Sequence, residues 1–343
     1  MAKLFKRKEI ETASMDAAEN AIANKEVEGL SQRQIVIKRF IHHRAAMIAL
    51  FSLILITVIV NTALEFKIGP WKIHGWWKYK VTDIPELRYK ECPGQVIGCP
   101  TLKLFPPSLG EHPFGQDDIG RDYLALVMRG AQRSLMVAFV IGVLGGVIGT
   151  IVGAISGFYR VIVDSVLMRF VDFVITVPAI IIGSVIGFRY GNLGAGFLAI
   201  YLGLFSWTGL SRLVRGEFLK LREMEFVDAA RVAGASNRRI IFKHILPNAV
   251  GIIIVSVTLL MSSAILLETA LSYIGFGVVA PDVSLGLLIS TYQDSFTSRP
   301  FLFWWPGFFI ISIALSINFI GDGLRDAFDP RQRRRVSRKE RGK

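Results

Sequence analysis

The chain has 343 residues, of which 52% are hydrophobic, and it carries a formal net charge of +13. Its apolar residues come in runs of about 20, which is typical of a membrane protein and excludes a single large soluble core. A positive charge can attract nucleic acid, but no aromatic-interleaved segment or nucleic-acid-binding module accompanies it here. We therefore expect an all-α integral membrane protein that binds no nucleic acid.

Six apolar runs are long enough to cross a membrane as helices. The first follows a charged stretch, residues 1–44, in which no secretory signal is found and which we interpret as a cytoplasmic tail with a basic amphipathic lead-in. Residues 134–322 would form a core domain of five spans, preceded by a first span and an outer segment. The expected spans are 45–64, 134–157, 169–187, 193–213, 249–274 and 302–322.

The distribution of Lys and Arg predicts the orientation of these spans. With the N-terminus inside, the inner segments hold 28 of the 40 Lys and Arg residues, and the outer segments hold 12. Because short cytoplasmic loops are enriched in these residues, both termini and the charged loop 214–247 are expected in the cytoplasm. We interpret the basic tail, residues 323–343, as a topology determinant and a contact for anionic membrane lipid.

The outer segment, residues 65–133, contains both cysteines of the chain, Cys92 and Cys99. An extracytoplasmic pair that flanks a Gly-containing turn is able to form a disulfide that closes a small loop. A disulfide and two free thiols remain equal alternatives at this point. Two cysteines without a His at useful spacing do not predict a metal site.

Five glycines in the second span lie on one helical face, because they are spaced four, three, four and four residues apart. Such a face predicts tight packing against another helix, in this chain or in a partner. The alternative is a smooth wall for a translocation path. The glycines are Gly142, Gly146, Gly149, Gly153 and Gly157.

The charged loop interrupts the apolar spans and reads as two helices joined by an elbow of small residues. Residues from Glu217 to Ala233 favour a helix, and Gly234 is placed to end it in a left-handed conformation. Ser236 is expected to cap a second short helix, and Pro247 to end it. Such a loop either lies on lipid headgroups or is gripped by another protein.

Two carboxylates and one proline inside the spans are candidates for the translocation path or its gate. Asp172 lies one turn from Arg169 and is expected to pair with it. Glu268 has no basic neighbour in the sequence, so it either lines the path or gate or is hydrogen-bonded inside the bundle. Pro178 should kink the third span, which would serve gating or only the shape of the bundle.

Two segments resemble motifs of bacterial ABC importers. Asp228-Ala229-Ala230, followed by Gly234 and then Leu246-Pro247, resembles the EAA motif of their membrane subunits, with Asp in place of the first Glu. HPFGQDDIGRD at residues 112–122 resembles the HPLGTDxxGRD segment of the dipeptide, oligopeptide and nickel branch. The likeness extends over about residues 112–331. One departure is Leu285, where the family usually carries Trp.

This resemblance implies the second, C-type permease subunit of such an importer, with the type I permease fold, in the bacterial inner membrane. It implies a heterodimer with a homologous permease, two ATPase subunits that bind ATP and Mg, and an extracytoplasmic solute-binding protein. Di- and oligopeptides are the expected substrates, while nickel chelates, glutathione, opines and microcins remain alternatives. The charged loop would be the coupling helix that docks on an ATPase, through Glu225, Asp228, Ala229, Ala230, Gly234, Ala235, Ser236, Leu246 and Pro247.

Other functional classes have less support in the sequence. The chain contains no G-x-x-x-x-G-K-[ST] segment that would bind nucleotide phosphates, so we expect no enzymatic activity and no cofactor in this chain. A stand-alone ion-coupled transporter or channel would need paired midplane charges, broken helices or repeated halves, and only Glu268 supports it. A membrane enzyme would need a nucleophile–base pair or a metal site, and neither is evident.

Overall fold

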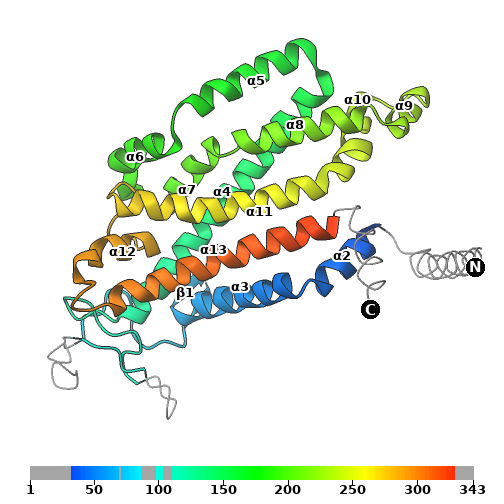
Figure 1. Ribbon diagram of the computed structural model, residues 1–343. Helices are drawn as coiled ribbons and strands as arrows, with labels where there is room; N and C mark the ends of the chain where they lie inside the picture. Colours follow the sequence, from blue (N-terminus) through cyan, green and yellow to red (C-terminus); the bar gives the residue numbers. More distant parts are fainter. Residues whose placement is uncertain (1–31, 69–70, 86–97, 103–109, 329–343) are drawn as a thin grey trace, which may run out of the picture.

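Long helices run side by side between the two ends of the molecule (Figure 1). The computed structural model describes residues 32–68, 71–85, 98–102 and 110–328. One end carries helices α2 and α9 and the last turn of α13, while the other carries β1 and α12. The charged loop and the C-terminal end of the last span therefore lie at the same end, as the Lys and Arg distribution predicts.

The described part of the chain is almost entirely helical. A small antiparallel hairpin, β1 (Phe66–Ile68) and β2 (Trp71–Ile73), follows the first span. The helices are α2 (Gln32–His42), α3 (Arg44–Ala63), α4 (Tyr123–Tyr159), α5 (Val161–Thr176), α6 (Ala179–Tyr190), α7 (Ala195–Phe205), α8 (Thr208–Arg222), α9 (Glu225–Val232), α10 (Asn237–Arg239), the π-helix η3 (Ile240–Ile245), α11 (Leu246–Tyr273), α12 (Leu285–Tyr292) and α13 (Phe301–Phe328), with 3₁₀ turns η2 (Gly191–Leu193) and η4 (Gln293–Ser295).

Five helices of the described residues are long and apolar enough to cross a membrane, and a sixth crossing is made if α5 and α6 form one span. That pair bends by 67° at its break. The sequence predicts a kink there, because Pro178 excludes helical backbone at the residue before it. Val177 is accordingly extended, with φ −89° and ψ 118°, and α6 begins directly after Pro178. The third span is thus two helices rather than one kinked helix.

Helix α4 is the centre of the bundle, and it packs most extensively against α8, α7 and α11. It begins at Tyr123 rather than near residue 134, where the expected span starts. The difference arises because Arg129 and Arg133 interrupt the apolar run that defines the predicted span, while the helix itself continues through them. At about 1.5 Å per residue, its 37 residues extend well beyond the hydrocarbon core of a bilayer.

The glycine face of α4 packs against two helices of this chain. A Cβ atom at Gly146 would lie 2.8 Å from Val257 of α11, and one at Gly157 would lie 2.7 Å from Phe218 of α8. The packing interpretation is therefore confirmed, and these glycines are covered by neighbouring helices. Such close approach of backbones is what small residues permit between membrane helices.

Candidate coupling site and the outer end of the bundle

Helix α9 projects from one end of the bundle (Figure 1) and holds the residues expected to dock on a partner. We call this the cytoplasmic end, and the opposite one the outer end, because the Lys and Arg distribution predicts that orientation. Val227 and Ala230 are buried against the cluster that contains Phe218 and Ile245. The opposite face is open to solvent, and Val232 at its end is 91% exposed. The amphipathic pattern of α9 therefore anchors one face and leaves the other free.

The residues predicted to dock divide between these two faces. Glu225 and Asp228 lie in the first turn of α9 and are exposed, and Asp228 pairs with Arg231 at 2.8 Å. Ala229 is also exposed, whereas Ala230 is buried. Ala229 is thus the alanine available to contact a partner, while the small side chain of Ala230 lets α9 pack closely against the bundle.

The elbow after α9 has the conformation that the sequence predicts. Gly234 has φ +77°, a left-handed value that costs glycine no Cβ clash. The N–H of Gly234 donates to the carbonyl of Arg231 at 2.9 Å, and that of Ala235 donates to the carbonyl of Ala230 at 3.0 Å. The Ser236 hydroxyl then caps the next helix by accepting from the N–H of Arg239 at 3.4 Å.

Two details of the loop differ from the sequence prediction. The expected helix from Glu217 to Ala233 is broken at Met224, whose backbone is extended, so that α8 and α9 are separate helices. Pro247 does not end the helix before it. The residues ahead of it form the π-helical turn η3, whose i→i+5 hydrogen bonds make room for the proline ring, and the helix continues into α11. Leu246 and Pro247 therefore lie in the first turn of a span.

A cluster of charged residues joins the helices on which α9 is seated. Arg215 of α8 donates to both carboxylate oxygens of Asp164 of α5, at 2.6 Å each. Arg160, between α4 and α5, pairs with Glu223 at 2.7 Å. Arg222 donates to the carbonyl of Phe158 at the end of α4. These bonds tie the cytoplasmic ends of α4, α5 and α8 together, directly before α9 begins.

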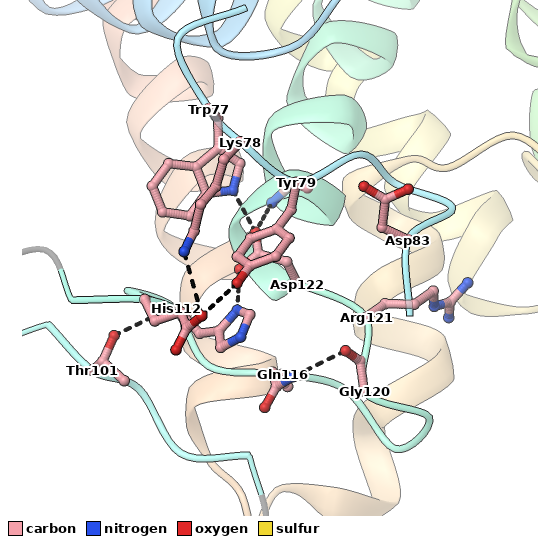
Figure 2. Close-up of polar contacts among 12 residues, drawn as sticks. Trp77, Lys78, Tyr79, Asp83, Thr101, His112, Gln116, Gly120, Arg121 and Asp122 are labelled. Carbon is pink, nitrogen blue, oxygen red and sulfur yellow. Dashed lines mark hydrogen bonds and ion pairs between the residues drawn. The ribbon is translucent and has the colours of Figure 1, made fainter. Parts of the chain in front are cut away.

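The segment HPFGQDDIGRD forms a capping structure at the outer end of α4 (Figure 2). Asp122 is fully buried and caps the helix by accepting from the N–H of Ala125 at 2.9 Å. It also accepts from the indole N–H of Trp77 at 2.7 Å, and its other oxygen lies 2.8 Å from Nδ1 of His112. The His and the last Asp of the motif therefore have a structural role, because they form hydrogen bonds that cap α4 and hold Trp77 against it.

The aromatic residue that stacks on this motif also holds an exposed carboxylate. Tyr79 stacks on His112 with ring centroids 4.7 Å apart, and its hydroxyl donates to Glu111 at 2.8 Å. That hydrogen bond, helped by the charge of Lys78, lowers the pKa of Glu111. The loop after β2 is thereby fixed against the start of α4 (Figure 2).

A second carboxylate of the motif, Asp117, links the start of α4 to α12. It is fully buried and accepts from the backbone N–H of Arg121 at 2.8 Å, from Arg121 Nε at 2.6 Å and from the hydroxyl of Tyr292 at 3.0 Å. Burial, and after it the charge of Asp117, raises the pKa of Tyr292, so its hydroxyl remains a donor. The motif therefore positions α12 as well as α4.

Glu268 of α11 lies inside the bundle and faces α4. Its side chain is fully buried and accepts from the hydroxyl of Ser134 at 2.9 Å and from that of Ser272 at 2.8 Å. Ser134 also accepts from the N–H of Leu285 at the start of α12, at 3.4 Å. The structure thus places Glu268 in a hydrogen-bonded network that joins three helices.

The other candidate residues fall in different places. The sequence predicts that Asp172 pairs with Arg169, and this is wrong. Asp172 pairs instead with Arg212 at 2.5 Å, because α8 brings a guanidinium beside it from outside its own helix. Cys99 is disulfide-bonded. Cys92 lies outside the described residues, so its pairing with Cys99 stays a prediction.

Comparison with known proteins identifies the family. Residues 149–334 match the family model described as "binding-protein-dependent transport system inner membrane component". The chain is 36% identical over 304 residues to the oligopeptide transport system permease protein OppC of Mycobacterium tuberculosis, covering 88% of this chain and 96% of that protein. It is 36% identical over 319 residues to OppC of Salmonella typhimurium, covering 93% and 97%. It is 37% identical over 295 residues to a putative peptide permease protein of Brucella ovis, covering 85% and 89%.

The chain belongs to this family of inner-membrane transport components. It is a permease subunit of an ABC importer and resides in the membrane, and its family implies ATPase and substrate-binding partners. One chain of an inward-facing structure of the MetNI methionine ABC transporter is similar to the permease, with a TM-score of 0.50 and 20% identity, covering 60% of this chain and 96% of that one. That likeness confirms the predicted all-helical importer permease fold.

The permease uses several residues that sequence reasoning missed. Asp164, Arg215 and Arg222 contribute to the cluster beneath α9, and their partners lie about 50 residues or more away in the chain. Their only signal in the sequence is charge at the cytoplasmic ends of spans. Leu285, the departure from the family pattern, is fully buried and helps to seat α12 through its N–H.

Proposed function

We propose that this permease forms half of the translocation path of a peptide importer. It pairs with a homologous permease as a heterodimer, receives peptides from an extracytoplasmic solute-binding protein, and is driven by two ATPase subunits. The observation that carries this proposal is helix α9, which is anchored on its inner face and open on its outer face. The relatives named oligopeptide and peptide permeases, at 36–37% identity over most of the chain, support di- and oligopeptides as the substrates.

In this proposal the energy reaches the permease through α9. The ATPase subunits bind ATP and Mg, close on each other and move the two α9 helices together. The charged cluster of Asp164, Arg215 and Arg222 passes that displacement to α5 and α8. The spans then turn from inward-facing to outward-facing, and hydrolysis resets them. The permease itself performs no catalysis and holds no cofactor.

A second permease would cover an apolar face that this chain leaves open. Val161, Ile162 and Phe173 of α5 are 69–78% exposed, and Phe188 of α6 is 80% exposed. The same face carries the Asp172–Arg212 pair, which is about half exposed and would be costly to leave in lipid. A partner helix with polar groups satisfies this face better than lipid does, which supports the heterodimer. Lipid then surrounds the remaining apolar surface.

Co-purification from detergent tests the docking role of α9. We expect the wild-type permease to retain its ATPase subunits and Val232→Asp to lose them, because a charge at this exposed apolar tip opposes burial in a groove. Gly234→Pro should do the same by excluding φ +77°. Asp228→Arg, on α9, should also lose the ATPase subunits. Its matched control is Asp326→Arg, which makes the same change at the same end of the molecule but outside α9 and should retain them. Equal recovery of the ATPases with all variants would contradict the proposal.

A further inference from the structure

The outer end of the bundle contains two adjoining hollows of about 680 and 380 Å³. Both are lined by Arg129 and Arg133 of α4, and by Val81 and Thr82 of the loop that follows β2. The smaller hollow is also lined by residues of the links between α6 and α7 and between α11 and α12. These hollows lie at the opposite end from α9, where a delivered substrate enters, and their sizes match small-ligand sites.

Most of the basic residues around the hollows have a carboxylate partner. Arg133 Nε lies 2.9 Å from Asp282, whose other oxygen accepts from the N–H of Ala195 at 3.2 Å. Lys80 pairs with Glu65 at 3.3 Å. Lys78, which lines the larger hollow, pairs with an exposed carboxylate at 3.4 Å. These charges are compensated within the chain.

Arg129 differs from these residues. Within the described part of the chain, its guanidinium forms no ion pair, and its bond to a neutral acceptor, Oε1 of Gln132 at 3.2 Å, is its one hydrogen bond. The amide of Gln132 is itself held, because its Nε2 donates to the carbonyl of Val60 at 2.8 Å. Gln132 thus steadies Arg129 without neutralising it. Asp282, which pairs directly with Arg133, acts on Arg129 only through its charge and not through a hydrogen bond. The half-buried guanidinium thus has no carboxylate bonded to it, and its planar set of N–H donors fits one.

We propose that Arg129 binds the C-terminal carboxylate of the peptide as it leaves the solute-binding protein and enters the path. This inference rests on the proposed function and specifies the substrate group that the permease itself recognises. A short peptide end enters hollows of this size, whereas a folded protein surface would contact only their rim. Arg133 stays paired with Asp282 and shapes the site, while Arg129 supplies the free positive charge.

The test uses the complete importer reconstituted in liposomes with its solute-binding protein. Uptake is measured for a tripeptide with a free C-terminus and for its C-terminal amide, each at a concentration shown to saturate the binding protein. Wild type, Arg129→Gln, Arg129→Lys and Lys80→Gln are compared. The last variant removes the same charge from the same hollow at a residue that is already paired with Glu65.

We expect wild type to transport the acid about tenfold faster than the amide, which is the order of one charge-assisted bond. In Arg129→Gln this ratio falls to about one, in Arg129→Lys part of it returns, and in Lys80→Gln it stays as in wild type. An unchanged ratio in Arg129→Gln overturns the inference. An equal loss for both peptides, with weaker binding of the solute-binding protein, also overturns it and makes Arg129 a docking residue. Absence of uptake of either peptide by wild type would overturn the proposed function itself.

Discussion

Arg215 of α8 holds Asp164 of α5 by two hydrogen bonds of 2.6 Å, and the hydroxyl of Ser156 of α4 bonds to the same carboxylate. Three helices of the bundle thus meet in one polar contact at their cytoplasmic ends. Of these three helices, α8 is the one that is followed directly by α9 in the chain. We therefore expect a force applied to α9 to reach α5, the first half of the broken span, through the Arg215–Asp164 pair.

Asp164→Asn should weaken this transmission. The amide keeps one acceptor oxygen but loses the charge and the bidentate geometry, so we expect a loss of about 1 kcal/mol of stability at this partly exposed site. The larger effect should be on coupling. In liposomes, ATP hydrolysis would continue while peptide uptake per ATP falls several-fold. The exchanged pair Asp164→Arg with Arg215→Asp should restore part of the coupling, and wild-type uptake per ATP in Asp164→Asn would argue against a role for the pair.

The sequence predicts the spans, their orientation and the elbow of the charged loop, because each of these depends on local composition. It does not predict the start of α4, because Arg129 and Arg133 end the apolar run on which the predicted span is based. The helix extends past them to Tyr123, where the buried side chain of Asp122 caps it. The break at Met224 has no Gly or Pro to mark it. It arises because the end of α8 is bonded to Phe158 while α9 must bury Val227, so tertiary contacts override helix propensity.

The partners of charged residues are likewise beyond local reasoning. Asp172 has Arg169 one turn away, yet α8 supplies Arg212 from 40 residues further along the chain. Glu268 has no basic neighbour in the sequence, and the hydroxyls that satisfy it come from a different helix as well as its own. The hydrogen bonds of Glu268 inside the bundle therefore depend on the packing of α4 against α11, which the local sequence does not reveal.

Glu268→Gln should leave stability and uptake close to wild type. Glutamine keeps an oxygen that accepts from Ser134 or Ser272, and it adds no charge to the buried network. Glu268→Leu should cost about 2–4 kcal/mol, because it leaves buried hydroxyls without their acceptor. Thermal unfolding in detergent measures the stability of both variants, and uptake into liposomes measures the transport of peptide. Loss of uptake in a stable Glu268→Gln variant would show that an ionisable group is required and would give Glu268 a role in the path or its gate.

Asp122→Ala should destabilise the outer end of the bundle by about 2–4 kcal/mol. The substitution removes a helix cap and leaves the partly buried indole N–H of Trp77 and the buried ring of His112 without an acceptor. Thermal unfolding is again the measurement, with Asp294→Ala, an exposed outer carboxylate, as the control. A variant as stable as the control would show that the motif serves something other than the start of α4.

Gly157→Ala and Gly216→Ala should have opposite effects. A Cβ atom at Gly157 would lie 2.7 Å from the carbonyl oxygen of Arg215, so α4 and α8 must separate, and we expect a loss of about 1–3 kcal/mol. Gly216 lies in α8 with no atom within 4 Å of the added Cβ, so alanine should gain roughly 0.5–1 kcal/mol from helix propensity. Thermal unfolding of the two variants side by side decides. Equal tolerance would contradict the packing role of the glycine face.

Docking of α9 on an ATPase subunit is the central claim, and a cross-link measures it most directly. Val232→Cys places a thiol on the 91% exposed tip of α9, and Ile37→Cys, which is 48% exposed on α2, provides a control at the same end of the molecule. In membranes that contain the whole importer, a short bifunctional reagent should join Cys at position 232 to an ATPase subunit, in a manner that changes with ATP, and should not do so from position 37. Equal cross-linking from both positions, or none from 232 in an intact complex, would contradict the account.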